Sequence, residues 1–340
     1  MELAITPLDV TDPTAVDEVF ALMTAARAAD VPDMPPPCRH WLAGALTFPR
    51  TYSRLENYVT RADGRTVGFL SLAFPLKENL ENSDIYDLIV HPGYRRRGIG
   101  RALYAYAMGR LQADGRKRTV GMTVATLPGG PQRDGAGGAF AVAMGAKNAL
   151  GEVRRRLDLS TVDEDALKVQ LAEAWQRADG YTLVQWRERA PDEYAADVGY
   201  LDGRMITDAP MGDIKWEPET VDVARVREGE ARCSAMKIRM YSTGVVHAAT
   251  NRMVAFTTIG FEESTPTHGM QWITIVDPDH RGHRLGIIVK IENLRYARAH
   301  EPGVTTVDTW NAAVNKHMIA INEAMGFRPV DLWENWQHEF

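Results

Sequence analysis

The chain repeats one short motif, and this repeat constrains its possible folds more than any other feature of the sequence. Residues 90–100 read Val-His-Pro-Gly-Tyr-Arg-Arg-Arg-Gly-Ile-Gly, and residues 276–286, 186 positions later, read Val-Asp-Pro-Asp-His-Arg-Gly-His-Arg-Leu-Gly. A second pair, Met144-Gly145-Ala146 and Met325-Gly326-Phe327, is separated by 181 positions. Two matches at nearly the same offset indicate a duplicated domain rather than a coincidence of short motifs.

The length of the chain agrees with two copies of one domain. At roughly 100–200 residues per domain, 340 residues are sufficient for two domains with a core each. The segment 160–165 is polar and carries a helix-capping pattern, Ser160-Thr161 followed by Asp163-Glu164. We therefore place the boundary there and predict one domain at residues 1–160 and a second at residues 161–340.

Apolar periodicity and turn residues predict mixed α/β structure with a similar order of elements in both halves. In the first half we expect strands at residues 3–8, 57–62, 66–74, 85–90, 119–124 and 153–159, and helices at 13–29, 98–113 and 137–144. In the second half we expect strands at 245–250, 253–259, 272–276 and 304–309, and helices at 285–300 and 312–325. The segment 181–241 has a helical bias, and we interpret it as an insertion that precedes the second sheet.

Composition excludes several classes of protein. Hydrophobic residues make up 45% and charged residues 25% of the chain, fractions that are typical of a globular protein. The net charge of −6 offers no general attraction to nucleic acid or to an anionic membrane, and no apolar run approaches the length of a membrane helix. Cys38 and Cys233 are too few for a disulfide framework, and residues 1–7 lack a signal-peptide pattern, so we expect a reducing, cytoplasmic setting. Histidines and cysteines lack metal-ligand spacing, and we expect no metal site.

The repeated motif joins a predicted strand to a predicted helix through a short basic turn. Such a turn places free backbone N–H groups at a helix start, where the helix dipole also favours an anion. Glycines at positions 98 and 100 allow the backbone to approach a diphosphate closely, and three arginines add positive potential. The turn matches neither the P-loop motif nor the dinucleotide-binding fingerprint. A run of arginines alone is usually a solvated surface turn, and the recurrence of this one between strand and helix favours a phosphate site.

Arg95-x-x-Gly98-x-Gly100 after an apolar strand resembles the acyl-CoA-binding signature of the GNAT (Gcn5-related N-acetyltransferase) superfamily. The second half adds the later element of that pattern, Asn315-Lys316-His317-Met318 followed by Met325-Gly326-Phe327. The resemblance covers both halves, and the duplication is similar to that of two-domain GNAT proteins of the mycothiol synthase type. It implies two tandem domains, each with a mixed, mostly antiparallel sheet that splays at its centre and is flanked by helices.

The resemblance also implies an activity and a set of binding residues. A GNAT enzyme transfers an acyl group, most often acetyl, from coenzyme A to an amine that attacks the thioester directly, and we expect a primary amine of a small molecule as acceptor and no metal. In the first half the coenzyme would bind Leu88, Ile89 and Val90 through its pantetheine, and Arg95, Arg96, Arg97, Gly98, Ile99 and Gly100 through its diphosphate. The corresponding residues of the second half are Ile275, Val276, Arg281, Gly282, His283, Arg284, Leu285, Gly286 and Asn315.

Both halves depart from the family pattern where catalysis is concerned. Arg284 stands where the first half has Gly98, so its side chain would crowd a diphosphate. The family often has a carboxylate early in the strand before the turn, and Asp84 holds this place in the first half, although a turn residue there is an equally good interpretation. The tyrosine that usually protonates the leaving thiolate is replaced by Ala141 and by Asn322. Asn322 itself and Asp308 are the further catalytic candidates in the second half.

The sequence leaves open which half reacts. The complete turn and Asp84 favour the first half, whereas relatives of the mycothiol synthase type react in the second. Because both tyrosine positions are lost, a non-catalytic acyl-CoA-binding or scaffold protein is an alternative to an enzyme. A peptide N-acetyltransferase is a second alternative, which would need an open groove for its substrate.

Overall fold

The computed structural model describes residues 4–340, which form two compact units. The first unit comprises residues 4–152, Met211–Glu217 and Asp331–Phe340, and the second comprises Val153–Pro210 and Pro218–Val330. None of the helices within the described residues combines the length and the apolarity needed to cross a bilayer.

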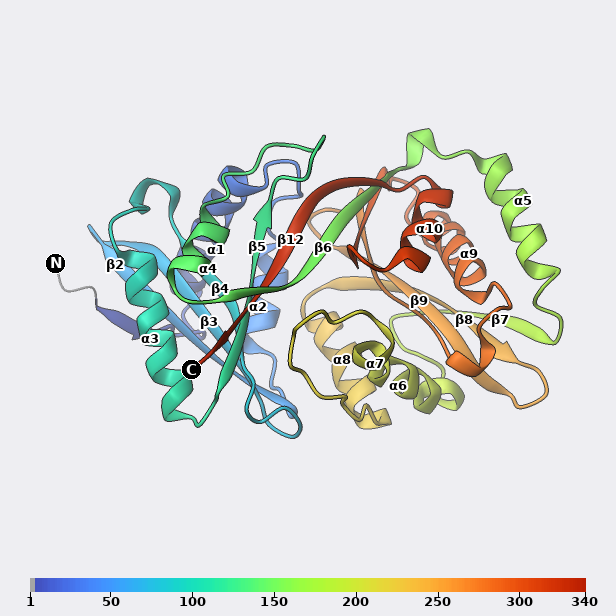
Figure 1. Ribbon diagram of the computed structural model, residues 1–340, viewed down its shortest axis with the longest axis horizontal. Coiled ribbons are helices and arrows are strands. Elements are labelled where there is room, and N and C mark those ends of the chain that lie inside the picture. Colours follow the sequence, from blue (N-terminus) through green and yellow to red (C-terminus); the bar gives the residue numbers. More distant parts are fainter. Residues whose placement is uncertain (1–3) are drawn as a thin grey trace. The chain divides into compact units, whose positions relative to one another are not determined.

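The first unit is built on a sheet with the strand order β1-β2-β3-β4-β5-β12-β6 (Figure 1). Neighbouring strands β1 to β4 are antiparallel, β4 is parallel to β5, and β5 is antiparallel to β12. The strands are β1 (Ile5–Pro7), β2 (Ser53–Ala62), β3 (Arg65–Pro75), β4 (Asp84–Val90), β5 (Arg118–Ala125), β6 (Lys147–Asp158) and β12 (Arg328–Glu339). The strands expected at residues 57–62 and 66–74 form a hairpin, with Asp63 and Gly64 at positive φ in its two-residue turn.

Helices cover both faces of this sheet. Val59 and Phe69 pack with α1 (Pro13–Asp30) and α2 (Arg39–Thr47), whereas their chain neighbours Tyr58 and Leu70 pack with α3 (Ile99–Ala113). This is the alternation expected of a strand buried on both faces. Helix α4 (Ala136–Ala143) lies on the α3 side, because the ring of Phe140 contacts that of Tyr104.

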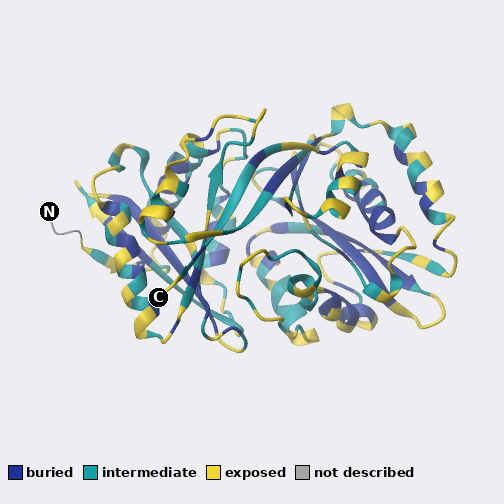
Figure 2. Ribbon diagram, viewed as in Figure 1, coloured by how far each residue is buried: buried dark blue, intermediate teal, exposed yellow. Residues whose placement is uncertain are grey.

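The second unit repeats this plan with the strand order β6-β11-β10-β9-β8-β7. Its own strands are β7 (Tyr181–Arg187), β8 (Ile238–His247), β9 (Arg252–Glu262), β10 (His268–Val276) and β11 (Thr306–Ala312). The central strands β3 and β9 are the most continuously buried of their units (Figure 2). Both are apolar along most of their length, as two-sided burial requires.

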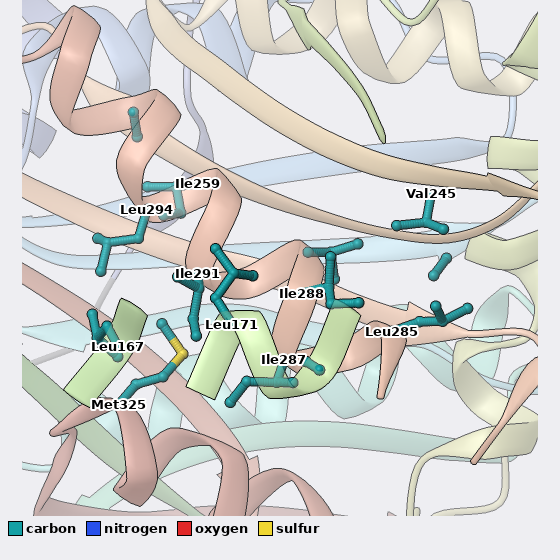
Figure 3. Close-up of a cluster of buried hydrophobic side chains, with 14 of the residues drawn as sticks. Leu167, Leu171, Val245, Ile259, Leu285, Ile287, Ile288, Ile291, Leu294 and Met325 are labelled. Carbon is teal, nitrogen blue, oxygen red and sulfur yellow. The ribbon is translucent and has the colours of Figure 1, made fainter. Parts of the chain in front are cut away.

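The second sheet also has helices on both faces. On one face α5 (Glu164–Trp175), α9 (Leu285–His300) and α10 (Lys316–Met325) bury an aliphatic core against β8 and β9, in which Ile288 and Ile291 face Val245 and Ile259 (Figure 3). On the other face α6 (Ala195–Gly203) packs on Phe256 and Met253, with α7 (Met205–Asp208) and α8 (Val223–Ala235) beside it.

Segment 181–241 is not the insertion that we expected from its helical bias. Its first residues form β7, which pairs antiparallel with β8 from Tyr181↔His247 to Arg187↔Tyr241. The first unit has the same arrangement, because β1 pairs antiparallel with β2 and is followed by α1 and α2. Segment 181–235 is therefore the second copy of the opening strand and helices of the domain.

Other predicted bounds shift by a few residues. Helix α10 begins at Lys316 rather than at 312, because β11 continues through Ala312 and the Asn315 side chain caps the helix by accepting from Met318 N–H (3.2 Å). Helix α5 is capped by Asp163, which accepts from Ala166 N–H (2.9 Å), rather than by Ser160. The first strand is β1 at Ile5–Pro7, and Leu3 lies outside the described residues.

The C-terminal strand β12 has no counterpart among the predicted elements. Its second part, from Asp331, belongs to the first unit and pairs with β5 from Leu332↔Ala125 to Glu339↔Arg118. Likewise, β6 contributes residues 147–152 to the first unit and residues 153–158 to the second. The compact units are thus not two contiguous stretches of chain, although the repeat from which we predicted them is present in the fold.

Candidate active site

The basic turn of the first unit connects β4 to α3. After Val90 the chain makes a short 3-10 helix at Pro92–Tyr94 and then reaches positive φ twice, at Arg96 (62°) and at Gly98 (85°). The first helical hydrogen bond joins Ala102 N–H to Gly98 C=O (3.0 Å), which leaves the N–H groups of residues 99–101 without an intrahelical acceptor. A Cβ atom at Gly98 would meet no atom within 4 Å, so the surface beside this glycine is open to a ligand.

The turn of the second unit follows the same path with its glycine moved. Positive φ occurs at Gly282 (87°) and Arg284 (61°), the positions that correspond to Arg96 and Gly98. Arg284 therefore adopts the backbone conformation of a glycine, at a cost of about 1 kcal/mol, and projects a side chain where the first turn has none. The backbone donors of this helix start are retained, since the first helical bond runs from Ile288 N–H to Arg284 C=O (3.3 Å).

Each turn has a second glycine, at the start of its helix. A Cβ atom at Gly100 would lie 3.5 Å from Phe140 of α4 and 3.7 Å from Val90 of β4. At Gly286 it would lie 3.4 Å from Ile321 of α10 and 3.8 Å from Val276 of β10. These are ordinary van der Waals distances, so both helix starts lie close to a strand and to the following helix, but packing alone does not require a glycine at either position.

The arginines of the two turns have different tasks. Arg95 forms a two-pronged ion pair with Asp30 of α1 (2.7 Å to each carboxylate oxygen) and donates to Val90 C=O (3.2 Å). Arg281 holds the same place in the second turn and pairs with Asp208 of α7 (3.2 Å). These two guanidinium groups fasten the turns to the fold, while Arg96 and Arg97 are exposed and offer their charge to a bound anion.

Strands β4 and β5 separate almost from their start. Within the described residues they pair at one position, Asp84↔Val120. In the second unit β10 pairs with β11 from His268↔Thr306 to Gln271↔Thr309. Beyond Gln271, β10 continues to Val276 without pairing to β11, while it remains paired with β9. The backbone of the last residues of β4 and of β10 therefore has an open edge toward the next strand, which confirms the splay expected in both halves.

A bulge accompanies the splay in each unit. Opposite β3, the pairing passes from Leu72↔Ile85 to Ser71↔Asp87, so Tyr86 is an extra residue in β4. Opposite β9, it passes from Ile259↔Gln271 to Thr257↔Thr274, which again leaves one extra residue, beside Trp272. Tyr86 and Trp272 occupy equivalent positions, and both are exposed (52% and 42%) although they lie within a sheet.

Asp84, the carboxylate singled out by resemblance, is the first residue of β4. Its backbone is paired on both sides, with Ala73 of β3 and with Val120 of β5, and the residue is half-buried. It therefore lies where the two strands are still joined, before the splay opens.

Asp308 is held in a buried ionic cluster. Its carboxylate accepts from Arg156 (2.7 and 2.8 Å) and Arg154 (3.1 Å), and His268 Nε2 lies 3.3 Å away. Burial raises the pKa of Asp308, but the hydrogen bonds from Arg156 and His268 outweigh burial and hold this pKa well below its ordinary value. A carboxylate so strongly stabilised as an anion is a weak proton acceptor, and its geometry is that of an anchor for β6 against β11.

Asn322 is fully buried and points into the second unit. Its Nδ2 donates to Asn311 Oδ1 (2.6 Å), while its own Oδ1 is buried without a hydrogen-bond partner in the described part of the chain. Asn311 lies in β11. An amide cannot donate a proton to a thiolate as an acid does, so neither position that lost the family's tyrosine supplies an acid.

Asp87 is a candidate that the sequence analysis missed. It lies on β4 directly after the bulge, beyond the last residue paired with β5, and on the α1 side, like Ile89 two residues later. No side chain among residues 4–340 forms a hydrogen bond or ion pair with its carboxylate. Desolvation raises the pKa of Asp87 to about 7, against the opposing charge of Arg27 on α1. The available signal was a second carboxylate within an otherwise apolar strand, Ile85-Tyr86-Asp87-Leu88-Ile89-Val90.

Histidines gather at the second turn without forming a metal site. Tyr181 Oη and His280 Nδ1 are hydrogen bonded (2.8 Å), and the rings of His247 and His280 lie 4.9 Å apart. Burial and the neighbouring His247 lower the pKa of His280. Within the described residues no group of three or more histidine, cysteine or acidic side chains is placed to hold a metal ion.

Comparison with known proteins identifies the family. The model of the acetyltransferase (GNAT) family matches residues 23–127. A solved structure described as a tandem GNAT protein from the clavulanic acid biosynthesis pathway is 36% identical, covers 99% of this chain and 98% of its own, and superposes with a TM-score of 0.84. The chain belongs to the GNAT family. It is therefore an acyl-CoA-dependent N-acyltransferase of the tandem GNAT type.

Two further solved structures share the fold at low identity. A GCN5-related N-acetyltransferase from Sphaerobacter thermophilus is 13% identical, with 99% of this chain and 95% of its own covered and a TM-score of 0.66. The N-myristoyltransferase of Saccharomyces cerevisiae is 12% identical, with 99% and 80% covered and a TM-score of 0.61. No curated protein sequence matches the chain.

Proposed function

We propose that the enzyme transfers an acetyl group from acetyl-CoA to a primary amine of a small molecule, and that the coenzyme binds in the first unit. The observation that carries this proposal is the combination, in one unit, of an open turn and a splayed strand. The turn offers the unpaired N–H groups of residues 99–101 beside Gly98, where no side chain intrudes. The strand offers a backbone edge at Leu88, Ile89 and Val90 that no longer pairs with β5, and these residues lead directly to that turn. On this stretch the Val90 C=O accepts from Arg95 (3.2 Å).

These features fit the two ends of coenzyme A. The diphosphate is an anion that suits a helix N-terminus flanked by the exposed Arg96 and Arg97. The pantetheine carries amide groups that can pair with a free strand edge as another strand would. When bound, the coenzyme supplies the activated acyl thioester; the protein positions it and removes water and protons from the reacting groups.

A segment of the first unit, residues 211–217, favours a small acceptor over a peptide. Residues 211–217, which belong to the first unit, lie against the end of the sheet where β4 begins. Asp213 N–H donates to Ala149 C=O (2.9 Å), Asn82 donates to Lys215 C=O (2.8 Å), and Asn79 exchanges two hydrogen bonds with Glu217 (2.7 and 3.0 Å). An extended peptide that entered from this end would collide with residues 211–217, whereas a small amine would not need this space.

The second unit differs from the first at three positions that matter for this chemistry. Arg284 replaces Gly98, Met270 replaces Asp84 and Ile273 replaces Asp87. We propose that residues 1–160 and 161–340 are two evolutionary copies of one domain, and that the second copy binds coenzyme more weakly, through residues 281–286 and Asn315. A cytoplasmic location, expected from the cysteine content, belongs to the same proposal.

Two measurements test the proposal. Release of free thiol from acetyl-CoA is followed with a panel of small primary amines and, separately, with peptides that have free N-termini. Turnover with small amines and none with peptides supports the proposal, and the reverse result supports the peptide N-acetyltransferase alternative. Native mass spectrometry counts the bound coenzyme: binding without turnover on any amine would show a scaffold protein.

A further inference from the structure

We infer that Asp87 is the group that takes the proton from the acceptor amine, and that the chemical step therefore takes place in the first unit. This inference rests on the proposed function and assigns a residue within the same site. It departs from the family resemblance, which pointed to Asp84.

Asp84 and Asp87 differ in their position along β4. Asp84 lies at the single pair that joins β4 to β5, where the backbone is engaged on both sides. The bulge at Tyr86 shifts the pleat by one residue, so Asp87 follows it on the splayed part of the strand. A bulge re-aims the side chains that follow it, and here it brings a carboxylate to the α1 side of the strand edge that the pantetheine would use.

The carboxylate of Asp87 also differs from other buried or half-buried carboxylates of the chain in its surroundings. Asp308, Asp30 and Asp331 are each tied to an arginine at 2.7 Å. Asp87 forms no such pair within the described residues, and the positive charge that acts on it is that of Arg27 on α1. Its partner across the ladder is the uncharged Ser71 of β3, and its neighbours on the strand are Tyr86 and Leu88. An unpaired carboxylate, poorly solvated yet reachable, binds a proton near neutral pH, which is the property a general base needs.

Strand β10 of the second unit differs from β4 at the positions of both carboxylates. The second unit has the same bulge and an aromatic residue, Trp272, at the place of Tyr86. At the position of Asp87 it has Ile273, and at the position of Asp84 it has Met270. Strand β10 therefore carries no carboxylate, and the remaining acid of this region, Asp308, is locked between two arginines.

The step balances without a further acid. The ammonium group of the acceptor gives one proton to Asp87, and the neutral amine attacks the thioester carbonyl carbon to form the C–N bond. The C–S bond then breaks with its electron pair on sulfur, and the second proton of the amine nitrogen passes to the thiolate. Asp87 returns its proton to water. Because the thiolate receives its proton from the reacting nitrogen, the loss of tyrosine at positions 141 and 322 is no obstacle to turnover.

The experiment compares Asp87→Asn with the wild type over pH 5.5–9, using the best alkyl amine of the panel. We expect kcat/KM of the wild type to rise with pH up to about 7, and Asp87→Asn to lose about a hundredfold or more together with this rise. The O-alkyl hydroxylamine with the same carbon skeleton carries no proton to remove at pH 8, so Asp87→Asn should retain most of the wild-type rate with it. Coenzyme binding, measured by calorimetry, should be unchanged because the turn is untouched.

Further variants separate a base from a structural residue. Asp87→Glu should restore part of the rate, and Arg27→Met should move the rise in kcat/KM to higher pH because the charge that favours the ionised carboxylate is gone. Glu81→Gln, which removes a half-buried carboxylate of the same unit that pairs with Lys117 and Arg118, should leave the profile unchanged.

Two results would overturn the inference, and they are distinct. A wild type that turns over while Asp87→Asn keeps its rate and pH profile would show that Asp87 is not the base, as would loss of the profile in Asp84→Asn alone. A wild type without turnover on any amine would refute the proposed function itself, and the role of Asp87 with it.

Discussion

Replacing Asp87 by asparagine should stabilise the protein at neutral pH and leave its stability at acidic pH unchanged. The pKa of this carboxyl is about 7 in the folded protein, against an ordinary value of 3.8. The folded state therefore holds the proton more tightly than the unfolded chain, and this contribution to stability is complete below pH 4. It is lost as the pH rises from about 4 to about 7.

The magnitude follows from the size of this pKa difference. One pKa unit corresponds to about 1.4 kcal/mol, so ionising Asp87 costs the fold at most ~4 kcal/mol. Because the side chain is half-buried rather than fully buried, water screens part of this cost, and we expect about 2 kcal/mol. For a unit of this size that free energy corresponds to a change in Tm of about 4–8 °C.

The assay is chemical and thermal unfolding of both proteins at pH 4.5 and pH 8, without coenzyme. Asp87→Asn should unfold at the higher temperature at pH 8 and within error of the wild type at pH 4.5. An equal difference at both pH values would mean that the substitution acts through packing. A variant less stable than the wild type at pH 8 would refute the reasoning, since it would show that the ionised carboxylate is well solvated or paired.

Three further predictions concern the turns and the ionic cluster. Gly98→Asp should abolish coenzyme binding by the first unit, whereas Gly98→Ala, which meets no neighbouring atom, should cost about 1 kcal/mol of stability through its positive φ and bind nearly normally; equal binding by wild type and Gly98→Asp would place the diphosphate elsewhere. Arg284→Gly should raise the number of coenzyme molecules counted by native mass spectrometry from one toward two, and an unchanged count would mean that the arginine does not limit the second site. Asp308→Asn should lower the free energy of unfolding by about 3 kcal/mol or more, because the buried Arg154 loses its counter-charge. The pH profile of turnover should be the same in Asp308→Asn, and a profile altered as in Asp87→Asn would restore Asp308 as a base.

The parts of the fold that could be predicted from the sequence are those set by local chemistry. Asp63-Gly64 specifies a two-residue turn because both positions need positive φ, and Asp12 caps α1 by accepting from Thr14 N–H (2.9 Å). The repeat also located both turns and the helices that follow them. Each of these signals acts within a few residues, so one sequence suffices to find it.

The parts that escaped prediction depend on partners far away in the chain. Residues 328–339 pair with β5 some 200 residues earlier, and nothing within the segment itself identifies that partner. Residues 181–187 form a strand because they pair with β8. This pairing partner lies about 60 residues later in the chain and outweighs the helical bias that we read for segment 181–241 as a whole. A boundary drawn at one point of the sequence could not show that β6 and β12 each contribute to both units.

The site shows the same division between local and distant causes. The turn could be found because glycine, arginine and a helix start are neighbours in the sequence. The state of Asp87 could not, because its pKa depends on burial beside α1, some 60 residues earlier, and on a bulge that only strand pairing shows. Asp308 was a reasonable candidate from its strand, and it is excluded by arginines about 150 residues away that no local pattern links to it.

The two copies have diverged in side chains while keeping their backbone geometry. The pair of positive φ values and the bulge recur in both units, although the residues that carry them differ, as Gly98 and Arg284 do. Backbone features of this kind are tied to the splay of the sheet, so losing one would disturb the fold. A side chain at the strand edge has no such constraint, and there the copies differ most, with Asp87 in one and Ile273 in the other. The exposed aromatic at the bulge persists even in the copy without a carboxylate, so its presence does not depend on that carboxylate. Retained binding geometry with a lost base is what we expect of a second unit that holds a ligand while the first unit reacts.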